Sequence, residues 1–289
     1  MTTTLFNATL ALASELGVLR TRLATGGSTS TLLDSVGRTE EDDNYNGGTV
    51  WLITDAGGAS AAPEGEFPII TDFANTGGVV SATFTVAPAA GDTYGIATAR
   101  YPRDVLIEAI NRQLVKYKMK RYDATSLDVV SAQSEYTLPA GITGANLIGV
   151  YESTVDDSND NQWVELNFHV QEAATGSTHT VVIDSKMIGV DNDFLLEYYD
   201  WHPRLYLSTD KIDGDIPLAL ILPAAAAHAE IIRMRTYGSE SKLDIDMLQF
   251  ARQEAEKAER RYPMRYKQRR GSINEAGGSY SRETGVVHP

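Results

Sequence analysis

The period of the hydrophobic pattern changes several times along this chain of 289 residues, and these changes constrain its fold more than any single motif. Near the N-terminus, leucines recur at helical spacing, at positions Leu5, Leu12, Leu16, Leu19 and Leu23. This spacing predicts an amphipathic helix that ends before the tandem glycines Gly26 and Gly27. From Arg38 to Ala99 the chain instead carries short apolar runs between Gly, Thr and Asp residues, which is typical of strands joined by tight turns.

A second helix is predicted from Arg103 to Tyr122. Pro102 suits the first turn of this helix, and the charge of Asp104 suits the positive end of the helix dipole. The helical spacing predicts a buried stripe of Leu106, Ile110, Leu114 and Tyr117. Cations at the far end would complement the dipole, with contact to an acidic neighbour or a phosphate as the alternative; they are Lys116, Lys118, Lys120 and Arg121.

Strand patterns return between Leu127 and Leu207, where Trp163 to Val170 alternates as a half-buried antiparallel strand does. After Asp213 the helical period resumes. It predicts two antiparallel helices, Ala224 to Tyr237 and Leu243 to Tyr262, joined by a short link. One face of the last helix carries Met247 and small residues that allow close helix packing: Ala251, Ala255 and Ala258.

Together these patterns predict an α+β fold: a helical bundle with two inserted antiparallel β-regions and an extended C-terminal arm. The N-terminal helix, the central helix and the C-terminal helical hairpin would form the bundle. The expected segments are 1–37 for the N-terminal helix and its connection, 38–99 for a β-rich insertion, 100–124 for the central helix, 125–213 for the second β-region, 214–262 for the hairpin and 263–289 for the arm. The bundle would pack through Leu12, Leu16, Leu19, Leu106, Ile110, Leu114, Ala251, Ala255 and Ala258.

Charge is distributed very unevenly along the chain. The whole chain carries -14, yet the stretch from Lys257 to Arg270 holds seven cations and a single acid, Glu259. The arm mixes these cations with aromatic rings, and its candidate contact residues are Arg260, Arg261, Tyr262, Arg265, Tyr266, Lys267, Arg269 and Arg270. Docking on a protein, contact with nucleic acid and a solvated tail all fit this composition. The Gly- and Ser-rich stretch from Gly271 to Pro289 is expected to be disordered without a partner.

The sequence contains no motif for catalysis or metal binding. It has no cysteine, which excludes disulfide and thiolate-metal frameworks and fits a reducing cytosol. The five histidines lack the spacing of helical zinc motifs, although His169 and His179 could be cross-strand neighbours, and the acidic loops Asp156–Asn161 and Asp210–Asp215 depart from the calcium-loop pattern. No segment approaches the roughly 20 apolar residues of a membrane span. We therefore expect no cofactor, no metal, no membrane role and no enzyme; a glycan hydrolase with two carboxylates is the enzymatic alternative.

The order of these elements resembles the head-to-tail adaptor, or connector, proteins of tailed bacteriophages. The resemblance lies in the helix Tyr101 to Leu114, in the phrase Gln133 to Pro139 before a strand that ends at Gly149 and Val150, and in Leu195 to Tyr199 running into His202 and Pro203. The Ala-rich closing helices complete it. It covers about two thirds of the chain, whereas the strand-rich region from Arg38 to Ala99 departs from the smallest, mostly helical adaptors.

The resemblance implies a structural virion protein in the head-tail neck, assembled in the host cytoplasm. Such a protein forms a homo-oligomeric ring, of roughly a dozen subunits, beneath the portal protein. It implies that the arm residues Arg260 to Arg270 dock on the portal, that a tail, stopper or nozzle protein binds the other side, and that DNA passes through the ring without sequence-specific binding. A tail, baseplate or head-decoration protein, with its β-regions as the contact surface, is the alternative.

Overall fold

The computed structural model describes residues 3–57, 64–130, 133–154, 162–172, 179–184, 193–237, 242–262, 271–274 and 279–282. The chain divides into two compact units. Unit 1 comprises residues 1–117 and 202–264, and unit 2 comprises residues 118–201 and 265–289. Unit 1 is therefore built from two stretches of chain that are separated in sequence by most of unit 2.

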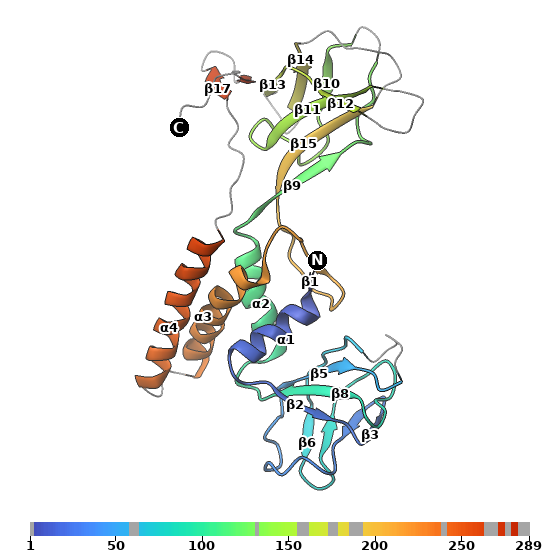
Figure 1. Ribbon diagram of the computed structural model, residues 1–289, viewed down its shortest axis with the longest axis vertical. Coiled ribbons are helices and arrows are strands. Elements are labelled where there is room, and N and C mark those ends of the chain that lie inside the picture. Colours follow the sequence, from blue (N-terminus) through green and yellow to red (C-terminus); the bar gives the residue numbers. More distant parts are fainter. Residues whose placement is uncertain are drawn as a thin grey trace. The chain divides into compact units, whose positions relative to one another are not determined.

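Four helices of unit 1 pack against one another (Figure 1). They are α1 (Leu5–Glu15), α2 (Arg103–Leu114), α3 (Leu218–Tyr237) and α4 (Lys242–Arg261). The Thr4 hydroxyl caps α1 by accepting a hydrogen bond from the Asn7 amide at 3.3 Å. Helix α2 begins after Pro102 and carries Asp104 in its first turn, as its sequence predicts.

Both of the first two helices are shorter than predicted. Helix α1 ends at Glu15 because Gly17 adopts a φ of 67°, and the amides of Gly17 and Val18 bond back to the carbonyls of Ser14 (2.9 Å) and Ala13 (3.1 Å). This pair of bonds is a Schellman motif, in which glycine is favoured at the left-handed position. The prediction that Leu19 and Leu23 continue the helix is therefore wrong: Leu23 lies in a strand and is 60% exposed.

The predicted extension of the central helix to Tyr122 is also wrong. Helix α2 stops at Leu114, and Lys118–Asp123 forms strand β9, which pairs with strand β15 (Phe194–Trp201) in unit 2. Cross-strand pairing has overridden the helical spacing here, which is common for short amphipathic segments. Lys118, Lys120 and Arg121 therefore belong to a strand and do not complement the dipole of α2.

The remainder of unit 1 is a β-region of two sheets and a short ladder. The strand orders are β2-β8-β5 and β3-β4-β7-β6, all antiparallel. Their bounds are β2 Arg20–Leu23, β3 Gly26–Ser28, β4 Thr31–Leu33, β5 Thr49–Thr54, β6 Asp72–Ala74, β7 Val79–Ser81 and β8 Thr93–Ala97. Both sheets contribute to one buried cluster that includes Val50, Phe73, Val80 and Ile96. Separately, strand β1 (Thr3–Thr4) pairs with β16 (Lys211–Ile212) and joins the chain start to the segment before α3.

A buried arginine organises one side of this β-region. The Arg38 Nε atom donates to the Tyr94 hydroxyl at 2.8 Å, and that hydroxyl donates to Asp34 at 2.6 Å. The Arg38 Nη1 atom also donates to the Tyr45 hydroxyl at 3.0 Å. Burial and the hydrogen bond to Asp34 raise the pKa of Tyr94, so the phenol stays protonated as the donor to that carboxylate. The buried charge is thus held by polar partners on several loops and strands.

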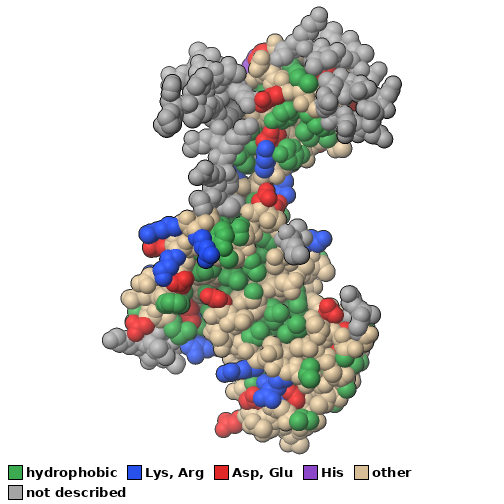
Figure 2. Space-filling view, in the orientation of Figure 1, with side chains coloured by type: hydrophobic (Ala, Val, Ile, Leu, Met, Phe, Trp, Pro, Cys, Tyr) green, Lys and Arg blue, Asp and Glu red, His purple; other side chains and the backbone are tan. Residues whose placement is uncertain are grey.

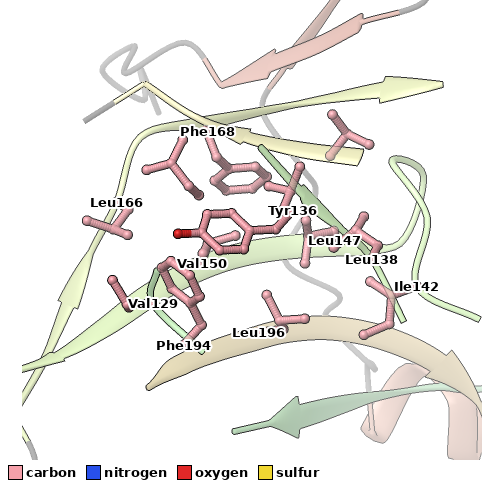
Figure 3. Packing of buried hydrophobic residues seen from close by; sticks show 13 residues of the cluster. Val129, Tyr136, Leu138, Ile142, Leu147, Val150, Leu166, Phe168, Phe194 and Leu196 are labelled. Carbon is pink, nitrogen blue, oxygen red and sulfur yellow. The ribbon is translucent and has the colours of Figure 1, made fainter. Parts of the chain in front are cut away.

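Unit 2 consists of two antiparallel sheets with one core between them (Figure 3). The strand orders are β12-β11-β15-β9 and β10-β14-β13-β18-β17. The further bounds are β10 Glu135–Thr137, β11 Leu147–Thr154, β12 Gln162–Glu165, β13 Phe168–Glu172, β14 His179–Ile183, β17 Gly271–Asn274 and β18 Ser279–Arg282. The rings of Tyr136 and Phe194, one from each sheet, meet edge to face with centroids 4.9 Å apart.

The last strands of the chain correct the prediction that the stretch from Gly271 to Pro289 is disordered without a partner. Strands β17 and β18 form an antiparallel hairpin, and β18 pairs with β13 through the registers His169 to Ser281 and Val170 to Tyr280. The hairpin thereby extends the second sheet at the edge of β13. Residues 263–270, 275–278 and 283–289 lie outside the described residues.

The predicted fold class, a helical bundle with two β-insertions, is wrong. Within the described residues the chain has eighteen strands in five sheets and only four helices, so β-structure forms most of the framework. The error arose where strands were assigned to helices, and where the closing hairpin was not anticipated. Each strand is short, and short strands depend on partners that are far away in sequence.

The core of unit 2 yields a first prediction. Phe194 is 1% exposed and packs on Tyr136, so Phe194→Ala should lower the free energy of unfolding of this unit by about 3–5 kcal/mol. Urea titration, with hydrogen exchange of the unit 2 amides, would measure the loss. The control is Val130→Ala, because Val130 is 49% exposed and should change stability by less than about 1 kcal/mol. Equal effects of the two variants would contradict this packing.

Candidate docking surface

The helices of unit 1 provide the rigid support for its surface. Of the predicted packing residues, Leu12, Leu106, Ile110 and Leu114 are fully buried. Leu16 and Ala258 are nearly so, whereas Ala251 and Ala255 are half-buried. Leu19 is half-buried outside the helix. The structure thus brings most of these residues into the helical layer, although not all of them lie on the elements to which the pattern assigned them.

A buried polar trio joins the start of α2 to α3. The Tyr101 hydroxyl donates to the Glu230 carboxylate, and the Arg233 Nε atom donates to the other oxygen of Glu230 at 2.8 Å. All three residues are at least 95% buried. Burial and the neighbouring Glu230 carboxylate raise the pKa of Tyr101, which keeps the hydroxyl as a donor. A buried carboxylate with two donors avoids most of the desolvation cost that an isolated charge would carry.

Side-chain amides of α2 fasten the second stretch of unit 1. The Asn111 side chain donates to the Leu205 carbonyl and accepts from the Leu205 amide, both at 2.8 Å. The Gln113 amide donates to the Ala224 carbonyl at 3.3 Å, next to Pro223 inside α3. Because these bonds span about ninety to one hundred and ten residues of sequence, they position α3, and with it α4, against the first stretch of the unit.

A groove lies where the end of α1 meets α3 and α4, with a volume of about 240 Å³. We call it the acidic groove. Its apolar lining consists of Leu16, Pro223, Ala226, Met247, Phe250 and Ala251. Its acidic lining residues are Glu15, Glu230, Asp246 and Glu254, with no cation among the described residues that line it. The Glu230 carboxylate is bonded to Tyr101 and Arg233, so the other three form the rim. The groove therefore offers an apolar floor and a negative rim.

The apolar part of this groove is unusually open to solvent. Phe250 is 62% exposed and Met247 38% exposed on α4, and Ile245 nearby is 43% exposed. Figure 2 shows hydrophobic and acidic side chains close together over the helical part of unit 1. An exposed aromatic ring next to other exposed apolar side chains is typical of a surface that a protein partner covers.

The basic end of α4 is the second element of this surface, and it consists of Lys257, Arg260, Arg261 and Tyr262. The side chains of Lys257 and Arg260 are 68% and 82% exposed. Lys and Arg side chains gather where α4 ends (Figure 2). The other predicted arm residues, Arg265, Tyr266, Lys267, Arg269 and Arg270, lie outside the described residues.

Sequence patterns did not indicate Phe250 or the acidic residues that line the groove, Glu15, Glu230, Asp246 and Glu254. Met247 was assigned to the face with the small residues, but Phe250 and Glu254 were not singled out. The signal was present, because positions 247, 250, 251 and 254 have the spacing of one helical face. What the spacing could not indicate is that α1 contributes Glu15 and Leu16 to the same groove.

The described residues contain no group of three or more His, Asp or Glu side chains that could hold a metal ion. His169 lies opposite Val182 and not opposite His179, and its ring binds Asp184 at 3.0 Å. The Asp210 carboxylate accepts the amides of Tyr206 and Leu207, and these bonds lower the pKa of Asp210, as in an ordinary turn. No helix in the described ranges is both long enough and apolar enough to cross a membrane.

Comparisons with known proteins do not assign a family. The sequence matches no protein-family model and has no significant similarity to a curated protein. The function of the chain is therefore inferred from its surfaces and from the pattern of its residues.

The buried trio predicts a large effect of one substitution. Glu230→Ala should lower the free energy of unfolding of unit 1 by about 3–5 kcal/mol, because it leaves the buried Arg233 guanidinium without its carboxylate. Tyr101→Phe removes one hydroxyl and should cost less, about 1–3 kcal/mol. Thermal and urea unfolding would measure both. A smaller effect for Glu230→Ala than for Tyr101→Phe would contradict the central position of Glu230.

His228 on α3 predicts an acid sensitivity. Its Nε2 atom lies 3.1 Å from the Arg112 Nη1 atom, which can only donate, so the neutral ring is favoured. Burial and the charge of Arg112 lower the pKa of His228; Lys116 and Arg235 act in the same direction, and Glu108 opposes them. The stability that the neutral His228 ring contributes is complete above about pH 6.5, the ordinary pKa of histidine. It is lost as the pH falls through the lowered pKa of His228 in the folded protein.

His228→Gln should therefore lose less stability than the wild type between pH 7 and pH 5, as measured by urea titration at each pH. The control is His169→Gln, because the ring of His169 faces the carboxylate of Asp184 in unit 2, whereas that of His228 faces the guanidinium of Arg112. An identical pH dependence in the wild type and in His228→Gln would contradict the lowered pKa.

Proposed function

We propose that this chain is a structural virion protein, a head-to-tail adaptor that forms a ring beneath the portal of a tailed bacteriophage and docks through its C-terminal arm. The observation that carries the proposal is the basic end of α4. Its cations point into solvent and lead directly to the remaining cations of the arm, in a chain that is otherwise strongly acidic. Such a segment fits an acidic groove on a neighbouring protein.

The acidic remainder of the chain supports a second part of the proposal, that the ring lines the DNA exit channel. The chain as a whole carries -14, and the residues outside the stretch 257–270 are more negative still. A negative wall repels DNA phosphates, so DNA slides past without being held. A protein with this function needs large contact surfaces and no catalytic residues, and we propose that the chain is not an enzyme.

The rigid helical layer suits this role. The arm begins at the end of α4, which packs on α3, and the trio of Tyr101, Glu230 and Arg233 fixes α3 in turn. A docking segment that starts from a fixed helix end has a defined point of departure, which lowers the entropy lost when it binds. The exposed Phe250 and Met247 add an apolar surface of the kind that protein partners cover.

One observation favours a second candidate, a tail, baseplate or head-decoration protein. The described residues are organised mainly in antiparallel sheets in both units, rather than in helices. In that case the sheets would supply the main contact surface, and the contacts would survive the loss of the basic arm.

Charge reversal of the arm distinguishes the two candidates. The variant Arg265→Glu, Lys267→Glu, Arg269→Glu, Arg270→Glu should lower binding to DNA-filled heads that carry a portal by at least about a hundredfold, because several charge pairs become repulsive. The control reverses four other exposed cations: Arg20, Lys211, Arg235 and Arg252. Co-sedimentation with heads measures the binding.

Electron microscopy of complete particles then locates the wild-type chain. Copies in a ring on the head axis, with the segment Arg260 to Arg270 against the neighbouring ring, are the expected result. Copies that cover the shell or a tail fibre, together with unchanged binding of the arm variant, would favour the decoration or tail candidate instead.

A further inference from the structure

We propose that the acidic groove binds the basic end of helix α4 from a second copy of this chain, so that successive copies join head to tail. This inference deepens the proposed function: the closure of the copies into a ring rests on that function, whereas the contact itself does not. It assigns a partner and an interface to two surfaces that the described structure leaves in solvent.

The lining of the groove specifies the chemistry of its occupant. Six apolar or small side chains form the floor, and the acidic side chains at its rim are Glu15, Asp246 and Glu254, whereas Glu230 is buried and bonded to Tyr101 and Arg233. An occupant must therefore combine apolar atoms with positive charge. The volume of about 240 Å³ is below the roughly 300–1,000 Å³ of typical small-molecule sites and suits one or two large side chains of a protein.

The rim already binds one cation of the type proposed. The Lys257 Nζ atom lies 2.6 Å from the Glu254 carboxylate at the edge of the groove. The other two exposed rim carboxylates, Glu15 and Asp246, form no ion pair or side-chain hydrogen bond among the described residues. The carboxylates of Glu15 and Asp246, which line the same groove as the exposed Phe250, can therefore pair with a cationic partner that also has an apolar component.

The basic end of α4 has this composition. Arg260 and Arg261 extend from the last turn, and the Arg261 guanidinium lies 5.8 Å from the centre of the Tyr262 ring. An arginine carries a planar cation on an apolar stem and pairs well with carboxylates, and an aromatic ring fills an apolar floor. Both groups are frequent among the residues that contribute most to protein interfaces.

A single copy cannot fill its own groove with Arg260 and Arg261, although its Lys257 pairs with Glu254 at the rim. Phe250 and Arg260 belong to the same helix, and ten residues of helix separate them by about 15 Å. A continuous helix cannot fold back on itself, so Arg260 and Arg261 can enter only the groove of another molecule. Because the two surfaces differ, the contact is heterologous, and such contacts close into rings or extend into filaments.

Two charge-reversed variants test this directly. The groove variant is Glu15→Lys, Asp246→Lys, and the helix-end variant is Arg260→Glu, Arg261→Glu. The wild type should self-associate as its concentration rises to about 100 μM, a range that populates contacts with micromolar Kd. Each variant alone should associate at least about tenfold more weakly, because its rim pairs become repulsive. Sedimentation velocity and native mass spectrometry measure the association.

Mixing the two variants gives the decisive result. In an equimolar mixture, the basic groove of the groove variant meets the acidic helix end of the helix-end variant. The acidic groove of the helix-end variant meets the basic helix end of the groove variant. Association should therefore return in the mixture, with the two variants alternating. A mixture that stays as weakly associated as its components, or a wild type that remains monomeric up to about 100 μM, would overturn the proposal.

Two further variants control for folding and for net charge. Phe250→Ser should weaken self-association at least about tenfold while circular dichroism and thermal unfolding stay unchanged, because the ring is mostly exposed in the single copy. Glu41→Lys, Asp215→Lys makes the same charge change as the groove variant at exposed positions outside the groove and should associate like the wild type. Normal association of Phe250→Ser would overturn the proposal.

These measurements use the purified full-length chain without heads, so they separate the two proposals. Self-association through the groove, together with no binding to heads, would leave this interface intact and overturn the adaptor function. If the chain binds heads but its groove variant self-associates as the wild type does, the adaptor function is supported and this interface is overturned. Binding of a different basic protein in the groove, with no competition from a second copy, would likewise overturn it.

Discussion

The contact between Tyr101 and Glu230 is the interaction on which unit 1 depends. It joins residues 129 positions apart, one in each of the two stretches that form the unit, and most of unit 2 lies between them in sequence. The Arg233 side chain completes the charge balance on the same carboxylate. Without this buried partner the second stretch, which carries α3 and α4, would lose its polar anchor to the start of α2, and Arg233 would lose the carboxylate with which it pairs.

The surface that we consider functional is a consequence of that anchor. Helix α4 contacts α3, and α3 contacts α1 and α2, so the position of the groove is set by the packing of all four helices. The same helix provides one wall of the acidic groove and ends in exposed cations. A helix that bears complementary charges at separate places is well suited to repeated head-to-tail contacts, which is the geometry that a ring requires.

The sequence predicted individual elements better than their assembly. The start of α2 at Pro102 and the pair of closing helices were both recognisable, because their signals lie within one or two helical turns. Residues 118–122 were assigned to the end of a helix because their cations suit the negative end of a helix dipole; only pairing with Phe194–Trp201 makes this segment a strand. The C-terminal hairpin was missed because its partner, β13, lies about a hundred residues earlier.

The sequence alone determined the properties that depend on composition and on neighbouring residues. These are the charge contrast between the acidic chain and its basic end, the absence of cysteine and the start of α2 after Pro102. The tertiary structure decided what lies next to what: the joining of Tyr101 to Glu230, the meeting of Leu16 with Phe250 in one groove, and the predominance of β-sheets. The physical reason is that charge and local turns depend on adjacent residues, whereas a strand or a groove requires partners that only the folded chain brings together.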